Sequence, residues 1–190
     1  MKQTDPVWFE RLPVALAERP QWCLWRYEER GGRFTKMPYQ PSGERASSTD
    51  PHTWSSLEAV QWAKWRHMGT YHGVGFVFSP DDPFVGIDLD HCRGQWWAAE
   101  LLDRFPTYVE ITPSWTGYHL IGLGTLPENK GRRKGPIEVY SAGHYFTIMA
   151  DIPGGSKAYV AVAPHDKQSI ADNAVGAGPS VCFPCPDGQM

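Results

Sequence analysis

The sequence has no long apolar run and no large excess of charge of one sign. No stretch approaches the roughly 18 consecutive apolar residues of a transmembrane helix, which argues against a membrane span. The opening MKQTDPVWFERL lacks the charged-then-apolar pattern of a secretory signal peptide, so we expect a cytoplasmic protein. The formal net charge of −3 excludes a uniformly basic nucleic-acid-binding surface, although it leaves room for a local basic groove.

Cysteine is also scarce, with four residues in a chain of 190. These do not make a disulfide framework in a reducing compartment. Cys182 and Cys185 form one CxxC, which is half a zinc site, and no second CxxC or histidine pair lies nearby. We therefore favour a disordered tail over residues 166–190 rather than a metal site, and we find no internal repeat.

Hydrophobic residues make up 41% of the chain, enough for the core of one domain. Residues 73–78 and 83–90 are separated by SPDD, which has the chemistry of a hairpin loop. Helices are predicted at 51–66, where Thr49-Asp50-Pro51 would begin the helix, and at 95–105. Periodicity predicts strands at 21–30, 33–39, 73–78, 83–90, 107–112, 116–124 and 136–150, with a basic loop at 128–135. This pattern predicts an α+β fold with a mixed or largely antiparallel sheet.

The segment VGIDLDHC places two carboxylates at the end of an apolar strand. Side chains alternate across a strand, so Asp88 and Asp90 share one face while Ile87 and Leu89 point into the core. Two such charges about 5 Å apart repel by roughly 3 kcal/mol at an effective dielectric near 20. A divalent cation such as Mg²⁺ or Mn²⁺ would relieve this repulsion, although an isolated DxD is more often a pair of solvated acids.

Two later segments carry further polar groups of interest. Glu138 lies in the strand PIEVY with its apolar neighbours on the opposite face, which alone is typical of a surface residue. In TPSWTGYHL, the hydroxyl of Ser114, the backbone at Gly117 and the imidazole of His119 could together bind an anion such as phosphate. A Ser–His nucleophile is the competing interpretation, but the sequence has no GxSxG elbow.

The order of these segments resembles the three motifs of the archaeo-eukaryotic primase superfamily, especially the phage and plasmid primase-polymerases. The first motif, a hydrophobic strand with DxD, matches 87–90; the second, close to S-P-S-G-x-G-x-H, matches 112–119 in part; the third matches Ile137-Glu138. The segments K-M-P-Y at 36–39 and T-D-P-H-T-W at 49–54 are similar to the family's N-terminal part. This chain departs from the pattern where Trp115 replaces a glycine and His144 stands where arginine is common.

The resemblance implies a two-lobed fold over residues 1–165, with an N-terminal lobe at about 1–80 and a catalytic lobe with an RRM-like sheet at about 81–165. It implies a metal-dependent nucleotidyltransferase, a DNA primase and polymerase that uses NTPs or dNTPs on single-stranded DNA in the replication of a phage, plasmid or other mobile element. A replicative helicase encoded nearby would be a further partner. Asp88, Asp90 and Glu138 would hold Mg²⁺ or Mn²⁺.

The remaining roles follow from the same resemblance and from charge. His119 would act in catalysis and, with four further residues, would bind the nucleotide: Ser114, Gly117, His144 and Lys36. Four basic residues would bind nucleic acid: Lys130, Arg132, Arg133 and Lys134. Two alternatives remain open, namely a catalytically weakened nucleic-acid-binding module of the same fold and a metal-dependent phosphohydrolase or nuclease.

Overall fold

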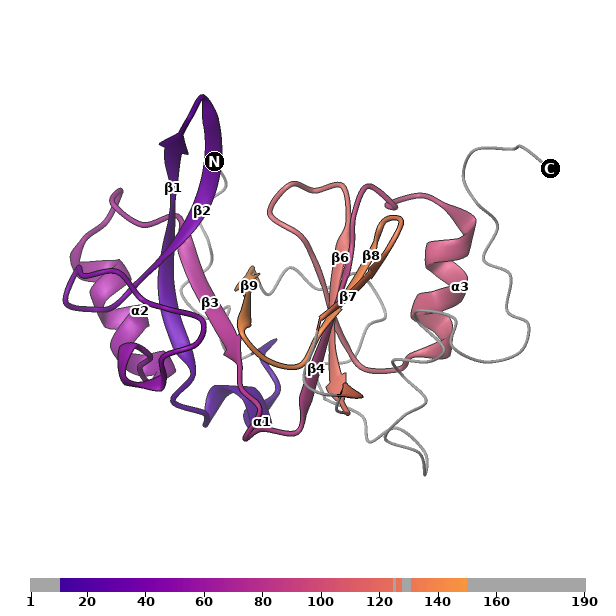
Figure 1. Cartoon of the computed structure of the whole chain (residues 1–190), viewed down its shortest axis with the longest axis horizontal. Coiled ribbons are helices and arrows are strands. Elements are labelled where there is room, and N and C mark those ends of the chain that lie inside the picture. Colours follow the sequence, from indigo (N-terminus) through magenta and orange to yellow (C-terminus); the bar gives the residue numbers. More distant parts are fainter. Residues whose placement is uncertain (1–10, 125, 128–130, 150–190) are drawn as a thin grey trace.

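The computed structural model describes residues 11–124, 126–127 and 131–149, which form two antiparallel sheets and a few short helices (Figure 1). The predicted α+β class is confirmed, and every strand pairing within the described residues is antiparallel. No helix in this part of the chain is long and apolar enough to cross a membrane. The predicted tail, with Cys182 and Cys185, lies outside the described residues, as does Lys130.

The first sheet has the strand order β2-β1-β3-β9. Its strands are β1 (Trp22–Arg30), β2 (Arg33–Tyr39), β3 (Gly73–Phe78) and β9 (His144–Ile148). β1 and β2 form a hairpin, and Gly31 and Gly32 turn it with φ of +56° and +76°, which glycine adopts without steric cost. α1 (Val14–Ala17) and α2 (Leu57–Arg66) contribute to the same hydrophobic core.

The first sheet is strongly curved. β2 and β9 are its two edge strands, yet the Tyr145 hydroxyl on β9 donates a 2.9 Å hydrogen bond to the Lys36 carbonyl on β2. Gly75 on the intervening β3 makes room for this reach, because a Cβ there would lie 2.7 Å from the Tyr145 ring. The curvature brings the backbone of β2 within reach of β9.

The second sheet has the order β5-β6-β4-β8-β7 and is covered on one face by α3 (Trp96–Arg104). Its strands are β4 (Phe84–Leu89), β5 (Tyr108–Ile111), β6 (Tyr118–Leu123), β7 (Arg132–Lys134) and β8 (Ile137–Tyr140). Val85, Ile87 and Leu89 pack against α3. Because side chains alternate, the residues between them face the other way, toward the first sheet.

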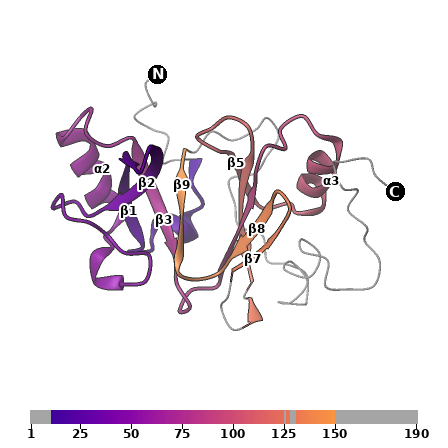
Figure 2. The same ribbon diagram turned by 45° about the horizontal axis from the view of Figure 1, so that its top comes forward.

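The chain passes between the two sheets twice, after β3 and again before β9 (Figure 2). The predicted hairpin of 73–78 with 83–90 is therefore wrong, since β3 and β4 belong to different sheets. The reason is the buried carboxylate of Asp82, which accepts hydrogen bonds from the N–H groups of Ser79 (2.9 Å) and Phe84 (2.7 Å) and from the Gln21 amide. These bonds hold the linker in a turn that redirects the chain instead of pairing its flanking strands.

Three further predictions need correction. The helix predicted from residue 51 begins only at Leu57, because Asp50 caps a short 3-10 turn, η2 (Pro51–Thr53), and Ser56 caps α2. The strand predicted over 136–150 is two strands, β8 and β9, separated by a turn in which Gly143 has a φ of +67°. Part of the predicted basic loop forms β7, which pairs with β8.

Candidate functional site

A row of five charged or polar side chains crosses the second sheet, with one residue from each strand. The antiparallel register sets neighbouring members directly opposite one another, in the order Glu110, His119, Asp88, Glu138 and Arg133. Such pairs point to the same face, with Cβ atoms about 4.5–5.5 Å apart. We call these five residues the polar row; it lies on the face opposite α3, toward the first sheet.

The buried end of the polar row is a carboxylate–imidazole pair. Glu110 is fully buried, and its Oε2 accepts hydrogen bonds from the Tyr108 hydroxyl and the Met149 N–H, both at 2.9 Å. Its Oε1 lies 3.0 Å from Nδ1 of His119, which is only 4% exposed and stacks on Phe146 with ring centroids 4.4 Å apart. Beside an ionised Glu110, Nδ1 would carry the proton, because a carboxylate only accepts hydrogen bonds; Nε2 faces Asp88.

Asp88 lies at the centre of the polar row, and one of its oxygens lacks a donor. Its Oδ1 is buried with no hydrogen-bond partner, and Nε2 of His119 is 3.8 Å away, beyond hydrogen-bond reach. Burial raises the pKa of Asp88. His119 and Lys36 lower this pKa, whereas the negative charges of Asp90 and Glu138 raise it further. A buried, unpartnered carboxylate oxygen among like charges would be stabilised by a cation.

The donor chemistry fits a divalent cation, since Mg²⁺ and Mn²⁺ prefer carboxylate oxygens. Among the described residues, however, no group of three or more His, Cys, Asp or Glu side chains is arranged to hold a metal ion. Both oxygens of Glu138 are engaged: Oε1 lies 2.8 Å from Nη1 of Arg133, and Oε2 accepts a hydrogen bond from the Tyr140 hydroxyl. Asp88 and Asp90 are therefore the readier ligands, and Glu138 would have to exchange Arg133 for the cation.

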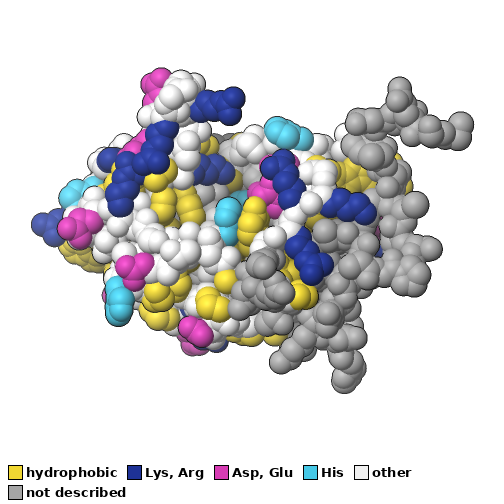
Figure 3. Space-filling model, viewed as in Figure 1, with side chains coloured by type: hydrophobic (Ala, Val, Ile, Leu, Met, Phe, Trp, Pro, Cys, Tyr) yellow, Lys and Arg dark blue, Asp and Glu magenta, His cyan; other side chains and the backbone are white. Residues whose placement is uncertain are grey.

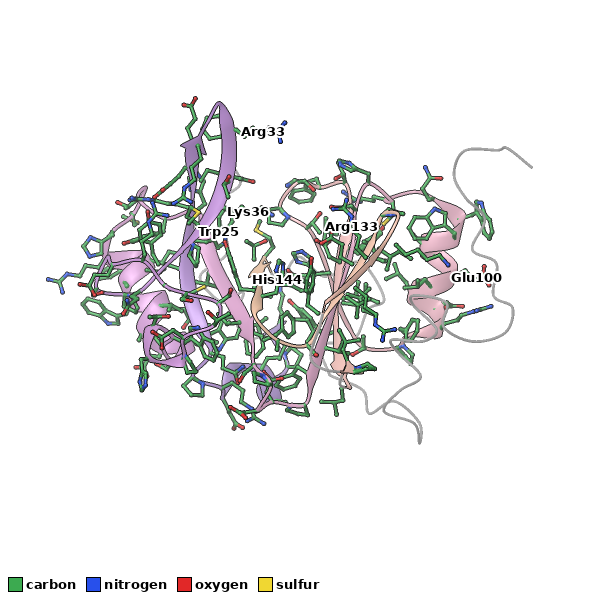
Figure 4. The ribbon with its side chains drawn as sticks, in the orientation of Figure 1. Trp25, Arg33, Lys36, Glu100, Arg133 and His144 are labelled. Atoms are coloured by element: carbon green, nitrogen blue, oxygen red, sulfur yellow. The ribbon has the colours of Figure 1, made fainter. Side chains whose placement is uncertain are left out.

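Two basic groups from the first sheet face the second. Lys36 of β2 and His144 of β9 lie between the sheets (Figure 4), whereas Arg133 lies on the edge strand β7 with an exposed side chain. Burial lowers the pKa of Lys36, while the negative charges of Asp88, Asp90 and Glu110 oppose this shift. Lysine, arginine, histidine and acidic side chains thus gather near the middle of one face of the molecule (Figure 3).

The His144 ring stacks on Tyr140, with centroids 3.8 Å apart and planes 8° from parallel. Burial lowers the pKa of His144, and the nearby charge of Glu138 raises it in part. Burial and Glu138 both raise the pKa of Tyr140, so its hydroxyl stays a donor. His144 therefore comes from a different sheet but contacts Tyr140, whose hydroxyl binds Glu138.

The loop that precedes β6 is anchored on the end of β4. Gly117 is buried, and a Cβ there would lie 2.0 Å from the Leu89 carbonyl oxygen, so only glycine fits this approach. The Ser114 hydroxyl is exposed and lies 3.0 Å from the Thr112 hydroxyl and 2.9 Å from that of Thr116. This exposed hydroxyl lies in a loop fixed beside the carboxylates, a placement suited to a ligand.

Comparison with known proteins identifies a phage relative. No family model matches the chain. A curated protein named DNA Primase-polymerase, from Nitratiruptor phage NrS-1, is 39% identical over 153 residues, which cover 74% of this chain. The chain is a homologue of a phage DNA primase-polymerase. The resemblance stated from the motifs is thereby confirmed, although the chain spans only about a fifth of that relative, 20% of its length.

The homologue is found from sequence alone, and the structure adds how the predicted site residues are arranged in space. It brings Asp88, Glu138 and His119 into one row and places Lys36 and His144 opposite them. Arg132 and Lys134 lie beside Arg133 on the edge strand β7, where they are partly or fully exposed.

Sequence reasoning missed Glu110 and Tyr140. A signal for Glu110 was present, because it is the one acid within the strand-like TYVEIT and alternation puts it on the same face as Tyr108. Tyr140 follows Glu138 by two residues and so shares its face, which brings the tyrosine hydroxyl to the carboxylate.

Proposed function

We propose that this chain is the catalytic domain of a DNA primase-polymerase. It transfers nucleotidyl groups from NTPs or dNTPs to a 3′-hydroxyl on a single-stranded DNA template during replication of a phage, plasmid or other mobile element. The observation that carries the proposal is the central part of the polar row, in which Asp88 stands directly opposite both Glu138 and His119. The homology to a phage protein named DNA primase-polymerase supports it.

Asp88 and Asp90, joined by Glu138, would hold Mg²⁺ or Mn²⁺. When bound, such a cation would supply Lewis-acid chemistry to the triphosphate and to the attacking hydroxyl. The unpartnered Oδ1 of Asp88 and the repulsion it experiences from Asp90 and Glu138 are the features that a cation would relieve. Release of Glu138 from Arg133 would leave the guanidinium available to a phosphate.

The basic groups would bind the triphosphate. His119 would contact it through Nε2, the nitrogen that Glu110 does not hold, while Lys36 and His144 would approach it from the first sheet. Ser114 and Gly117 would add a hydroxyl and a fixed backbone. Arg132, Arg133 and Lys134, with Lys130, would bind the phosphates of the DNA strand.

The same resemblance leads us to propose a two-lobed fold, with lobes at about 1–80 and 81–165. Within the described residues, β9 comes from the later part of the chain but pairs with β3. The lobes would therefore exchange one strand, and the site would lie where the two sheets meet. A replicative helicase would be a further partner.

A primer-extension assay tests the proposal. Purified protein is incubated with a primed single-stranded template, labelled nucleotides and Mn²⁺, alongside the double variant Asp88→Ala/Asp90→Ala. The matched control is Asp81→Ala/Asp103→Ala, which removes two exposed acids outside the polar row. We expect incorporation by the wild type and the control but not by the first double variant; absence of incorporation by the wild type would refute the proposal.

A second candidate is a nucleic-acid-binding replication module that does not turn over. The engagement of both Glu138 oxygens by Arg133 and Tyr140 favours it, because this acid is then occupied without a metal ion. The same assay separates the two candidates, since the module would bind the template without incorporating nucleotides. Degradation of the template would instead indicate a nuclease.

A further inference from the structure

Trp115 adopts a backbone conformation that tryptophan rarely takes. Its φ is +63°, and in the described part of the chain His91 is the other non-glycine residue with a positive φ. In this left-handed region the Cβ of an L-residue approaches the backbone too closely, and a bulky residue there is a genuine outlier. Such strain persists where the surroundings enforce it, often at a binding site.

The surroundings of Trp115 do enforce its position. Its N–H donates a 2.9 Å hydrogen bond to the Thr112 carbonyl, and the Thr116 carbonyl accepts one of 2.9 Å from the Arg93 N–H. Gly117 packs on the end of β4, where a Cβ would lie 3.4 Å from the Cα of Asp90. The loop that carries Trp115 is therefore fixed directly beside the DxD carboxylates.

The indole is exposed and accompanied by a cation. Trp115 is 44% exposed, and the Arg93 guanidinium lies 5.7 Å from the centroid of its ring. Nη1 of Arg93 also donates a 3.3 Å hydrogen bond to the Trp115 carbonyl, so the arginine is held on both the ring and the backbone. The exposed Trp65 and Trp96, in contrast, lie on regular helices and need no strained backbone.

An exposed ring beside an arginine is the arrangement on which nucleobases stack. Every base has a π-face, and the guanidinium adds a cation–π contribution and a charge for the adjoining phosphate. We propose that Trp115 and Arg93 form a stacking platform for a nucleobase at the edge of the carboxylate site. The proposal rests on the proposed function, and the base can come from the DNA strand or from the nucleotide.

Binding measurements on the full chain test the platform. Trp115→Ala and Trp115→Phe are compared with the wild type, and Trp65→Ala is the control for loss of an exposed indole. The first arm measures the Kd of a labelled oligothymidylate in EDTA by fluorescence anisotropy, and the second measures the Kd of dTTP with Mn²⁺ by calorimetry. An abasic oligonucleotide of the same length reports phosphate contacts without bases.

If the base belongs to the strand, Trp115→Ala raises the Kd of the oligothymidylate by about 5- to 100-fold, while Trp115→Phe keeps most of the affinity. The abasic strand and Trp65→Ala then show little change. If the base belongs to the nucleotide, only the Kd of dTTP rises by such a factor. Changes below about twofold in both arms would overturn the platform, as would equal losses for abasic and normal strands.

The binding test of the stacking platform can fail or succeed independently of the primer-extension test of the proposed function. Loss of oligonucleotide affinity in Trp115→Ala together with no incorporation by the wild type would keep the platform and refute the polymerase. Incorporation by the wild type together with unchanged binding by Trp115→Ala would support the polymerase and refute the platform. Trp115→Gly, which relieves the positive φ, provides a folded variant without the ring if Trp115→Ala does not fold.

Discussion

Replacement of Glu110 by alanine should destabilise the protein more than loss of any exposed acid. Glu110 is fully buried and satisfies three donors: the Tyr108 hydroxyl, the Met149 N–H and Nδ1 of His119. A buried donor left without an acceptor costs about 1–3 kcal/mol, and Glu110→Ala leaves three such donors. We therefore expect the free energy of unfolding to fall by roughly 4 kcal/mol.

Urea denaturation followed by circular dichroism measures this loss. With a slope of about 2 kcal/mol per molar urea, the midpoint should fall by about 2 M. The control is Glu100→Ala on α3, which breaks an exposed 2.7 Å ion pair with Arg104, worth about 0.3–0.5 kcal/mol (Figure 4). A midpoint for Glu110→Ala within about 0.5 M of the wild type would refute the role of Glu110 as a buried acceptor.

Glu110→Gln separates positioning from stability. The amide keeps one oxygen acceptor but brings an NH₂ group toward donors, so it no longer fixes the proton on Nδ1 of His119. If the proposed function holds, we expect kcat/KM for the nucleotide to fall by about 10- to 100-fold, because the misoriented His119 would no longer present Nε2 to the triphosphate. An unchanged kcat/KM in a folded Glu110→Gln protein would show that Glu110 is structural only.

Three further substitutions test the turns that shape the molecule. Asp82→Ala should cost about 2–4 kcal/mol, because three donors lose their buried acceptor, whereas exposed Asp81→Ala should cost less than about 0.5 kcal/mol; equal urea midpoints would contradict this. Gly117→Ala should lower the melting temperature by about 6–12 °C, because its Cβ would lie 2.0 Å from the Leu89 carbonyl oxygen, and an unchanged melting curve would rule out the close approach. Trp115→Gly should be more stable than Trp115→Ala by about 1 kcal/mol because of the positive φ; the reverse order in urea would exclude a left-handed backbone there.

Local patterns predicted the orientation of Asp88. Alternation within VGIDLDHC placed Asp88 on the face opposite to Ile87 and Leu89, and the structure has those two residues packed against α3. The strands predicted at 21–30 and 33–39 are likewise present, as the paired strands β1 and β2. These features depend on residues within a few positions of one another, which is the range over which sequence patterns act.

Register and connectivity between distant strands could not be predicted in this way. Whether β3 continues into a hairpin or crosses to another sheet depends on the partners of Asp82, one of which is Gln21, far away in the sequence. Asp50 and Ser56 are both good N-cap residues, so the sequence offered two possible starts for α2. In the structure Asp50 caps the short 3-10 turn and Ser56 caps α2. Burial of Glu110 likewise required donors from β6 and from the end of β9.

One strand that packs against the polar row, β9, is not part of the second sheet. β9 pairs with β3 in the first sheet, yet its Phe146 stacks on His119 and the Met149 N–H that follows it binds Glu110. Gly86 on β4 leaves the space for this ring, since a Cβ there would lie 2.6 Å from it. Removal of β9 would thus take a packing surface and a hydrogen-bond donor from the second sheet, although it carries none of the proposed metal ligands. The orientation of His119 toward Asp88 is therefore set by the contact between the two sheets, and a deletion confined to the first sheet would disturb the site in the second.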